Sequence, residues 1–361
     1  MSAAANPPTV ERVELAPGYS VARVVNGGWQ LSPGHGRPAA RGDDTIDALT
    51  RLVERGLTTF DCADIYGGVE ELLGALVRRW VERHGAAARA QIQLHTKLVP
   101  DREDLSRVDR AYVERCVDRS LRRLAVECLD LVQLHWWSYE VRGYVDAALA
   151  LCDLRRAGKI RHFGVTNFDV ARLGELIDAG AVPLTHQLQY SLLDHRPEHG
   201  MVRLCRQHGI RLLCYGSLAG GWLGPHWHGR DEPTTMPANR SQVKYRLIID
   251  EAGGWVQLQS LLRETARIAA RHGADGANVA LRYVLDRPAV AAVIVGAVDD
   301  RHAASNLRLF SLHLTDAETA NLRDIAKRAA GPAGDVYGLE RVPGGRHAAI
   351  MKYNLNRDTR G

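Results

Sequence analysis

The sequence lacks the segments that would place the protein in a membrane or direct it out of the cell. No apolar run among the 361 residues approaches the ~18 residues that a membrane-spanning helix needs. Residues 1–18 contain no basic region followed by an apolar one, which is the pattern of a secretory signal. The six cysteines form no C-x-x-C pair and lie mostly in apolar runs, as reduced thiols of a packed core do. We therefore expect a cytoplasmic protein with no membrane partner.

The sequence also lacks a basic segment interleaved with aromatic residues, which is the pattern of many nucleic-acid-binding surfaces. The 47 basic residues are nearly balanced by 42 acidic ones, and the net charge is +5. Hydrophobic residues make up 45% of the chain and charged residues 25%, which is typical of a globular protein with a sizeable core. We expect no nucleic-acid partner.

Short apolar segments rich in β-branched residues alternate with amphipathic segments along the chain. Eight such segments have the character of strands: 22–29, 57–63, 92–97, 129–136, 160–167, 184–191, 211–218 and 291–297. Helical patterns follow at about 43–55, 70–83, 109–124, 143–157, 169–179, 198–208, 255–272 and 300–310, with a last one at 315–330. Continuous apolar strands are typical of a parallel sheet buried on both faces. Eight strand–helix units predict a closed (β/α)8 TIM barrel.

Three segments lie outside these units. Residues 13–22 fit a short N-terminal hairpin, 219–254 form a long insert after the seventh strand, and 331–361 form a C-terminal extension. We expect one domain over residues 1–361, with the barrel at about 20–330. Segments of this length are usually lids or disordered. The tail carries cations that a lid could use to bind an anionic substrate, but a surface extension is the favoured interpretation; these cations are Arg341, Arg346, His347 and Lys352.

Polar residues collect at the ends of consecutive strands. Asp61 ends the second strand and Tyr66 follows it, Lys97 ends the third strand, and His135 ends the fourth. The carboxyl ends of barrel strands meet at one mouth, where active sites are built. A carboxylate, a phenol, an ammonium and an imidazole at one mouth predict proton-transfer chemistry.

The chemistry of these groups suggests their roles. A free phenol titrates near ~10, and the ammonium of Lys97 would lower the pKa of Tyr66 and make it a better acid. Asp61 would hold Lys97 charged, and His135 would hydrogen-bond a substrate carbonyl. A proton delivered to an alkoxide implies a hydride delivered to the carbonyl carbon, and a nicotinamide cofactor is the usual source.

An ordered set of motifs over residues 12–328 resembles the aldo-keto reductase superfamily. The motifs are "FDCADIYG", "HTKL", "LVQLHWW", "GKIRHFGVTNF", "HQLQYSLLD", "CYGSLAGGWL" and "VIVGAVDDRHAASNL". The resemblance implies a (β/α)8 barrel and an NAD(P)H-dependent oxidoreductase of the carbonyl reductase or alcohol dehydrogenase type. Such an enzyme reduces an aldehyde or ketone to an alcohol, in a reaction that can run both ways. The family's catalytic tetrad maps onto Asp61, Tyr66 (the general acid), Lys97 and His135.

The resemblance also implies a cofactor site and a substrate pocket. The cofactor residues would be Gly28, Trp29, Asp61, Thr166, Asn167, Gln187, Tyr215, Gly216, Ser217, Leu218, Gly220, Gly296, Arg301, His302 and Asn306. The nicotinamide would rest on Tyr215, and backbone groups of 216–221 and of the helix start after Gly296 would hold the pyrophosphate and adenosine. The substrate pocket would be formed by Trp29, Tyr66, His135, Trp136 and Trp137, and no metal is implied.

The residues expected near a 2′-phosphate do not clearly favour either NADPH or NADH. The resemblance favours NADPH, but residues 296–298 contain no Lys or Arg. Asp299 and Asp300 would repel a 2′-phosphate, and an acid can instead accept from a ribose hydroxyl. Arg301 is the one cation nearby in the sequence. We expect NADPH to be favoured, with NADH not excluded.

Other functions are weaker interpretations of the same sequence. "GHGRPA" (34–39), with Asp61 further on, imitates a dinucleotide-binding turn, but Pro38 lies where a helix N-terminus should offer N–H groups. "HWH" (226–228) would suit a metal, yet it lies in the insert and not at a strand end. The main alternative is a cofactor-binding regulatory barrel subunit with little turnover. The sequence specifies neither the substrate nor whether the protein is a monomer or a homo-oligomer.

Overall fold

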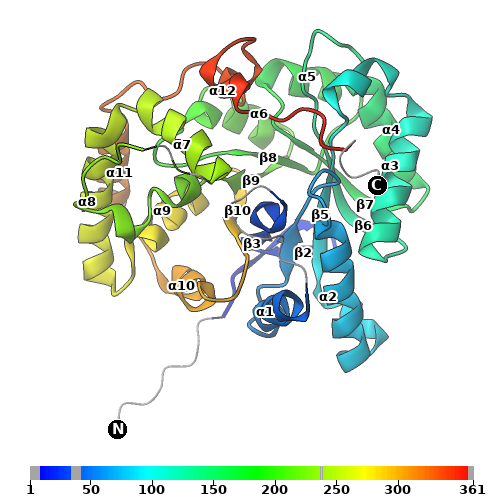
Figure 1. Ribbon diagram of the computed structural model, residues 1–361, viewed down its shortest axis with the longest axis horizontal. Helices are drawn as coiled ribbons and strands as arrows, with labels where there is room; N and C mark the ends of the chain where they lie inside the picture. Colours follow the sequence, from blue (N-terminus) through cyan, green and yellow to red (C-terminus); the bar gives the residue numbers. More distant parts are fainter. Residues whose placement is uncertain (1–8, 34–41, 236, 238, 357–361) are drawn as a thin grey trace.

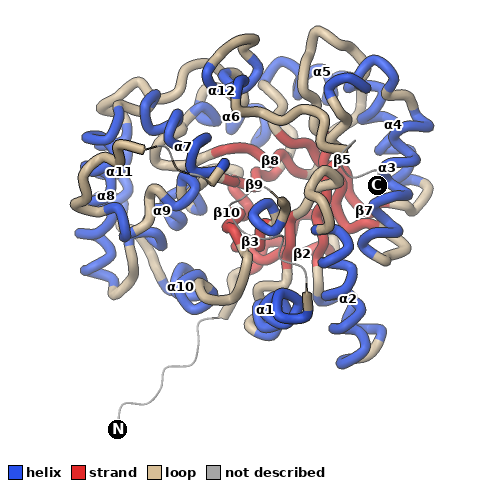
Figure 2. Tube along the Cα trace, in the orientation of Figure 1, coloured by secondary structure: helices blue, strands red, loops and turns tan. Residues whose placement is uncertain are grey.

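The computed structural model describes residues 9–33, 42–235, 237 and 239–356. Eight parallel strands close into a barrel, and helices surround it (Figures 1 and 2). In order around the barrel the strands are β10 (Val290–Gly296), β3 (Val24–Gly27), β4 (Thr59–Asp61), β5 (Gln93–Leu98), β6 (Leu129–Leu134), β7 (Ile160–Thr166), β8 (Thr185–Gln189) and β9 (Arg211–Tyr215). The prediction of a (β/α)8 TIM barrel is confirmed, and each expected strand segment overlaps one strand.

The barrel strands have no face exposed to water. All six residues of β5 and all six of β6 are buried, because helices cover the outside and side chains fill the inside. Polar residues at the carboxyl ends of such strands enter a region with little water. Electrostatic interactions are stronger there than at the surface.

Outside the insert and the tail, the helices follow the expected pattern with one addition. The expected segments contain α1 (Asp43–Glu54), α2 (Val69–His84), α3 (Arg110–Leu124), α4 (Tyr144–Arg156), α5 (Val170–Asp178), α6 (Met201–Gln207), α8 (Gly254–His272), α10 (Ala303–Arg308) and α11 (Asp316–Ala326). The sequence patterns did not predict α9 (Gly276–Leu285), which starts with a capping box between Asp275 and Asn278. Helix α9 packs against β10, and α8 packs outside it against α9 and α11.

The expected N-terminal hairpin is present. Strands β1 (Arg12–Ala16) and β2 (Tyr19–Ala22) pair antiparallel. The hydroxyl of Tyr19 lies 2.9 Å from Nε2 of His95 inside the barrel. Arg12 donates to the side chain of Gln93 at 2.8 Å. These contacts fasten the hairpin to the end of the barrel opposite the strand carboxyl ends.

The insert after β9 is folded and is not a loose loop. It contains two 3₁₀ turns, η5 (Ala219–Gly221) and η6 (Pro225–Trp227), and the helix α7 (Arg240–Glu251). The ring of Trp222 is fully buried and lies 4.4 Å from Trp227 and 5.8 Å from Trp255 of α8, measured between centroids. This aromatic cluster fixes the insert to α8 and brings α7 over the barrel mouth, where it contacts η5.

The expected C-terminal extension is present, and it packs against the barrel. It forms η8 (Leu339–Arg341) and α12 (Arg346–Ala349), and after α12 the red chain in Figure 1 crosses the barrel mouth toward the segment that follows β5. Nη2 of Arg341 donates to the Trp136 carbonyl at 2.8 Å. At the far end, Nδ2 of the buried Asn356 donates to the Val99 carbonyl at 2.8 Å.

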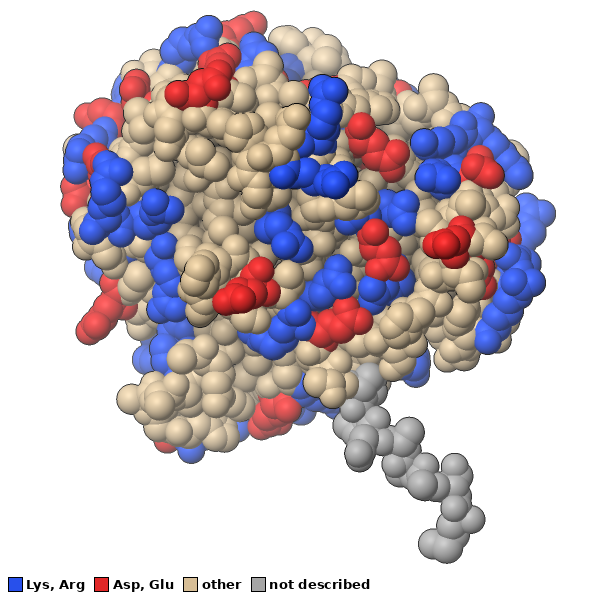
Figure 3. Space-filling model, turned by 180° about the vertical axis from the view of Figure 1, so that it is seen from behind, with Lys and Arg blue, Asp and Glu red and all other residues tan. Residues whose placement is uncertain are grey.

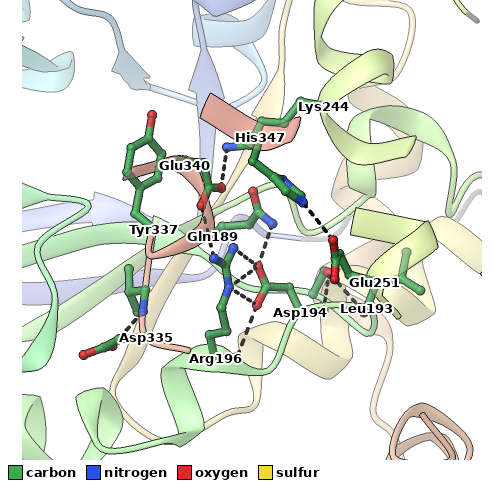
Figure 4. Close-up of polar contacts among 12 residues, drawn as sticks. Gln189, Leu193, Asp194, Arg196, Lys244, Glu251, Asp335, Tyr337, Glu340 and His347 are labelled. Carbon is green, nitrogen blue, oxygen red and sulfur yellow. Dashed lines mark hydrogen bonds and ion pairs between the residues drawn. The ribbon is translucent and has the colours of Figure 1, made fainter. Parts of the chain in front are cut away.

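A buried network of charges holds the tail in place (Figure 4). Arg196 donates to Asp194 at 2.7 Å and to Glu340 of the tail at 3.1 Å, and all three side chains are at most 1% exposed. On its other side Glu340 lies 3.6 Å from the ammonium of Lys244 on α7. Burial lowers the pKa of Lys244, and Glu340 opposes that change. One tail carboxylate thus links the barrel, the insert and the tail.

The rest of the surface carries mixed charge. On the face opposite that of Figure 1, acidic and basic side chains are interspersed (Figure 3). Within the described residues no helix is long and apolar enough to cross a membrane. The segment 34–39, which imitates a dinucleotide-binding turn, lies outside the described residues, and the closed barrel excludes the open doubly wound sheet that such a turn serves.

The buried histidines predict a loss of stability in mild acid. The Phe168 amide donates to Nε2 of His186 at 3.1 Å, so protonation of Nε2 would break this hydrogen bond. Burial, with a contribution from the charge of Arg341, lowers the pKa of His186 from 6.5 to about 3. Between these values the unfolded chain binds the proton and the folded chain does not. The stabilisation is therefore complete above pH 6.5 and is lost as the pH falls toward 3, at up to about 1.4 kcal/mol per pH unit.

Urea unfolding at pH 6.0, 5.3 and 4.6 checks this prediction. The variant His186→Gln keeps a side-chain acceptor for the Phe168 amide but does not titrate. We expect its free energy of unfolding to depend less steeply on pH than that of the wild type. Identical slopes in the two proteins would show that His186 is not a source of the acid sensitivity.

The network around Glu340 predicts a second stability effect. Glu340→Ala leaves Arg196 and Lys244 buried without this carboxylate, and removing one partner of a buried ion pair costs roughly 3–5 kcal/mol. The matched control is Arg346→Ala, because Arg346 lies in the same tail and its pair with Asp250 is largely exposed. Loss of such an exposed pair costs about 0–1 kcal/mol. Similar, small changes in the urea unfolding free energy of both variants would contradict a tail anchored by the network.

Candidate active site

A buried ion pair lies at the carboxyl ends of β4 and β5. Nζ of Lys97 donates to Oδ2 of Asp61 at 2.5 Å and to the Cys62 carbonyl at 2.8 Å. Burial alone would lower the pKa of Lys97, but Asp61 reverses this and raises it to about 12. Lys97 therefore remains an ammonium at neutral pH.

The second oxygen of Asp61 is also satisfied. Oδ1 accepts from Nε2 of Gln187 at 2.7 Å and from Nε2 of Gln133 at 3.2 Å. All of these side chains are buried, and a buried carboxylate needs such partners to stay ionised. The sequence identified Gln187 only as a cofactor contact and did not identify Gln133. The signal was present, because Gln133 lies two residues before His135 and alternate residues of a strand share a face.

Tyr66 lies beside this pair. Its ring centroid is 5.2 Å from the Lys97 ammonium and 4.8 Å from the Trp29 ring. Burial raises the pKa of Tyr66, the charge of Lys97 opposes that change, and the net result is about 12. The expectation that Lys97 lowers this pKa below that of a free phenol is therefore wrong, because burial outweighs the ammonium. The phenol keeps its proton at neutral pH.

His135 follows β6 at the same mouth. Its Nδ1 lies 3.3 Å from the Thr166 carbonyl, which can only accept, so the hydrogen of the neutral ring resides on Nδ1. Its Nε2 is buried and has no hydrogen-bond partner among the described residues. Burial and the charge of Arg341 lower the pKa of His135 to about 3. The ring therefore presents an acceptor to the mouth, and not the N–H that donation to a carbonyl requires.

The expected nicotinamide platform is half-buried at the end of β9. The hydroxyl of Tyr215 donates to Oδ1 of Asn167 at 2.7 Å, and Asn167 holds a positive φ of 63°. The ammonium of Lys244 lies 5.1 Å from the Tyr215 ring centroid. A nicotinamide stacked on Tyr215 would therefore lie near the ammonium of Lys244. The sequence analysis did not assign Lys244 to this site.

The loop after β9 has little room for larger residues. Gly216 and Gly220 have φ values of 70° and 64°, which favour glycine. A Cβ at Gly216 would lie 2.4 Å from the Tyr245 hydroxyl, and one at Gly220 would lie 2.7 Å from the Tyr245 ring. Tyr245 of α7 thus covers this loop. Ser217 in the same loop is buried, and Leu218 is half-buried.

Two other expected cofactor glycines are also tightly packed. A Cβ at Gly28 would lie 2.8 Å from Val69 and 3.1 Å from the Asp61 carbonyl. A Cβ at Gly296 would lie 2.5 Å from the side-chain oxygen of Gln30. Gln30 is therefore a further polar side chain at the expected cofactor site.

The part of the cofactor site where the adenosine is expected contains more cations than the local sequence 296–302 suggests. Asp300 accepts two hydrogen bonds of 2.9 Å from Arg51 of α1 and lies 3.8 Å from Arg55. Asp299 pairs with Arg301. The two acids are thus neutralised, so the argument that they repel a 2′-phosphate is weakened. The positions of Arg51 and Arg55, about 250 residues away in the sequence, could not be inferred from local motifs.

The helix expected to start after Gly296 is shorter than predicted. Helix α10 has only six residues and begins at Ala303. Its first turn follows His302, which is exposed, and Asn306 is half-buried within it. The short helix offers a weak dipole to an anion at this end, whereas several arginine side chains lie there.

The two expected tryptophans of the pocket differ in position. Trp136 is fully buried, and its indole N–H donates to the Val141 carbonyl at 2.8 Å. The ring of Trp137 meets His135 edge-on at 4.3 Å, and Trp137 lines a cavity of about 460 Å³ beneath the tail. The geometry thus places Trp137 at the pocket and Trp136 in the core. His226 and His228 lie in the insert, and the described residues contain no group of three or more potential ligands arranged for a metal.

Comparisons with known proteins agree with this geometry. The model of the aldo/keto reductase family matches residues 23–327. Protein tas of Escherichia coli is 28% identical over 324 residues, covering 80% of this chain and 91% of the relative. The aldo-keto reductase yakc of Schizosaccharomyces pombe, whose name specifies NADP(+), is 26% identical over 84% of this chain and 87% of the relative. An NADH-specific methylglyoxal reductase of E. coli is 23% identical over 85% and 95%.

Solved structures show the same fold. The glycerol dehydrogenase of Gluconobacter oxydans superposes with a TM-score of 0.72 at 24% identity, covering 91% of this chain and 98% of that one. An aldo/keto reductase of Klebsiella pneumoniae in complex with NADP and acetate superposes with a TM-score of 0.64 at 24% identity, covering 88% and 94%. The match of the family model over most of the barrel, together with the strand-end residues described above, shows that this chain belongs to the aldo/keto reductase family.

Proposed function

We propose that the protein is an oxidoreductase that reduces an aldehyde or ketone to an alcohol. The observation that carries this proposal is the buried Asp61–Lys97 pair with Tyr66 beside it and His135 at the same mouth. This arrangement supplies a protonated phenol, a fixed positive charge and an imidazole acceptor around one position. Membership of the family supports an oxidoreductase; the assignment of Tyr66 as the acid is ours.

NADPH is the favoured cofactor and NADH is not excluded, because relatives and structural neighbours include proteins named for either cofactor. The residues present fit a dinucleotide: an aromatic platform at Tyr215, a glycine-rich loop at 216–221 and arginines around Asp299 and Asp300. When bound, the cofactor supplies the hydride. All other steps depend on this chain's own residues.

Tyr66 would deliver the proton. Its pKa of about 12 keeps it protonated at neutral pH, and an alkoxide is a stronger base than a phenolate, so transfer to the product oxygen is favourable. The ammonium of Lys97 would stabilise the phenolate that remains. Asp61 keeps Lys97 charged and directed, with Gln133 and Gln187 satisfying its second oxygen.

His135 would orient the substrate as an acceptor. With its hydrogen on Nδ1, the free Nε2 can accept from a hydroxyl next to the carbonyl, while the hydroxyl formed from the carbonyl keeps its hydrogen for Tyr66. This role differs from donation to the carbonyl oxygen, and it suits both directions of the reaction.

Tyr66→Phe tests the proposal. We expect turnover of a carbonyl panel to fall by about 10²- to 10⁴-fold, because the general acid is lost. NADPH binding, measured by fluorescence titration, should change little. The matched control is Tyr112→Phe on α3, which removes a phenol outside the mouth. A wild-type rate in Tyr66→Phe would contradict the mechanism, and wild-type protein that binds NADPH but reduces no carbonyl would favour the regulatory alternative.

Arg301 is proposed to bind the 2′-phosphate of NADPH. Its partner Asp299 competes for the same guanidinium. Arg301→Ala should therefore weaken NADPH binding by about tenfold and leave NADH binding nearly unchanged, whereas Asp299→Asn should strengthen NADPH binding. Dissociation constants for both cofactors check this pair. An unchanged NADPH-to-NADH ratio in both variants would place the 2′-phosphate elsewhere.

A further inference from the structure

The cavity of about 460 Å³ beneath the tail is rich in arginine. Its wall combines Arg102 after β5, residues after β6, the start of α5 and the tail, so four separate segments build it. The cations in this wall are Arg102, Arg172 and Arg341. Its aromatic residues are Trp137, Tyr139 and Tyr353.

Arg341 is held rigidly and has no acidic partner among the described residues. Its guanidinium carbon lies 4.3 Å from the Tyr139 ring centroid and 5.0 Å from that of Tyr337. Its two Nη groups donate to the carbonyls of Trp136 and Tyr337 at 2.8 and 3.3 Å, and its buried Nε has no hydrogen-bond partner among the described residues. Carbonyl groups and aromatic faces fix this cation without neutralising it, and a guanidinium in this state favours an anion.

The other charges around the cavity do not neutralise Arg341. Glu340 lines the cavity, but its carboxylate is directed to Arg196 and Lys244. Glu140 is exposed. Arg172 also lies over the Tyr139 ring and is 3.6 Å from Asp169, and its Nε also lacks a partner among the described residues.

The cavity adjoins the proposed reaction centre. Trp137, which lines it, meets the ring of His135 edge-on at 4.3 Å. Tyr337, which packs on Arg341, meets the same imidazole at 5.6 Å. Tyr337 thus contacts both Arg341 and His135, and the charge of Arg341 helps to depress the pKa of His135.

We infer that this cavity binds an anionic group of the carbonyl substrate, so that the enzyme acts on aldehydes or ketones that carry a carboxylate or a phosphate. The inference rests on the proposed carbonyl reduction. Arg341 supplies the main contact, Arg172 supports it, and the aromatic wall receives the body of the substrate. The carbonyl end lies toward Tyr66 and His135, and the anionic end lies beneath the tail.

Three benzaldehydes of similar size test the inference. They are 4-carboxybenzaldehyde, 4-formylphenyl phosphate and the neutral methyl 4-formylbenzoate. We expect kcat/KM of the wild type to be at least about tenfold higher for one or both anions than for the ester, and the preferred anion distinguishes carboxylate from phosphate. Arg341→Gln should lower kcat/KM for that anion by about 10- to 100-fold, as for loss of a charge-assisted hydrogen bond. The decrease for the ester should be much smaller, so that the ratio of kcat/KM for the anion to that for the ester falls by at least about fivefold.

Companion variants separate charge from structure. Arg341→Lys keeps the charge but loses the planar fork, so it should restore part of the anion preference. Arg346→Gln is the matched control, because Arg346 is an arginine of the same tail that does not line the cavity, and it should behave like the wild type. If Arg341→Gln fails to fold, Arg172→Gln tests the second arginine of the same cavity wall.

A measurement of ligand binding tests the anion site independently of carbonyl reduction. Calorimetric titration with 4-methylbenzoate and with phenyl phosphate, which have no carbonyl to reduce, should show binding of at least one to the wild type and binding at least tenfold weaker to Arg341→Gln. If the ester is reduced as well as both anions, and neither ligand distinguishes the two proteins, the inference is wrong and carbonyl reduction stands. If no aldehyde is reduced, the proposed function fails, and the calorimetry alone decides whether the cavity binds anions.

Discussion

The ion pair between Asp61 and Lys97 is the interaction on which the site depends. A lysine in a barrel mouth would lose its charge to desolvation, yet here a carboxylate at hydrogen-bond distance raises its pKa to about 12. The carboxylate in turn needs two glutamine amides from β6 and β8 to satisfy its second oxygen. The ion pair therefore requires positions on four strands, β4, β5, β6 and β8, to be in register, and the closed barrel supplies that register.

A second set of buried charges has a different effect. Asp194, Arg196, Glu340 and Lys244 lie at the same mouth but touch none of the proposed proton-transfer groups. They link segments that are far apart in the sequence, because Glu340 is 144 residues from Arg196. Since each charge is buried, loss of the tail would leave Arg196 and Lys244 without the Glu340 carboxylate, and this cost keeps the tail over the mouth.

The sequence predicted what local and periodic patterns determine. The apolar strands and the polar residues at their ends gave the barrel and placed Asp61, Lys97 and His135 together, because parallel strands bring their carboxyl ends to one mouth. It did not predict the fold of the insert or the tail, since contacts such as Trp222 with Trp255 and Arg196 with Glu340 depend on tertiary packing. Nor could it give the pKa direction of Tyr66, which depends on the balance between burial and the charge of Lys97.

The cations at the barrel mouth affect both the protonation state of His135 and the binding of a substrate. Lys97, Lys244 and Arg341 all help to depress the pKa of His135, after burial itself, so the imidazole stays neutral and can accept a hydrogen bond. A cation of this set that has no acidic partner also adds a positive potential where a substrate must enter, and a positive cleft concentrates ligands of the opposite sign. Lys97 is neutralised by Asp61 and Lys244 is paired with Glu340, whereas Arg341 has no carboxylate among the described residues. The uncompensated part of the field therefore lies under the tail, at the cavity and not at the proton donor.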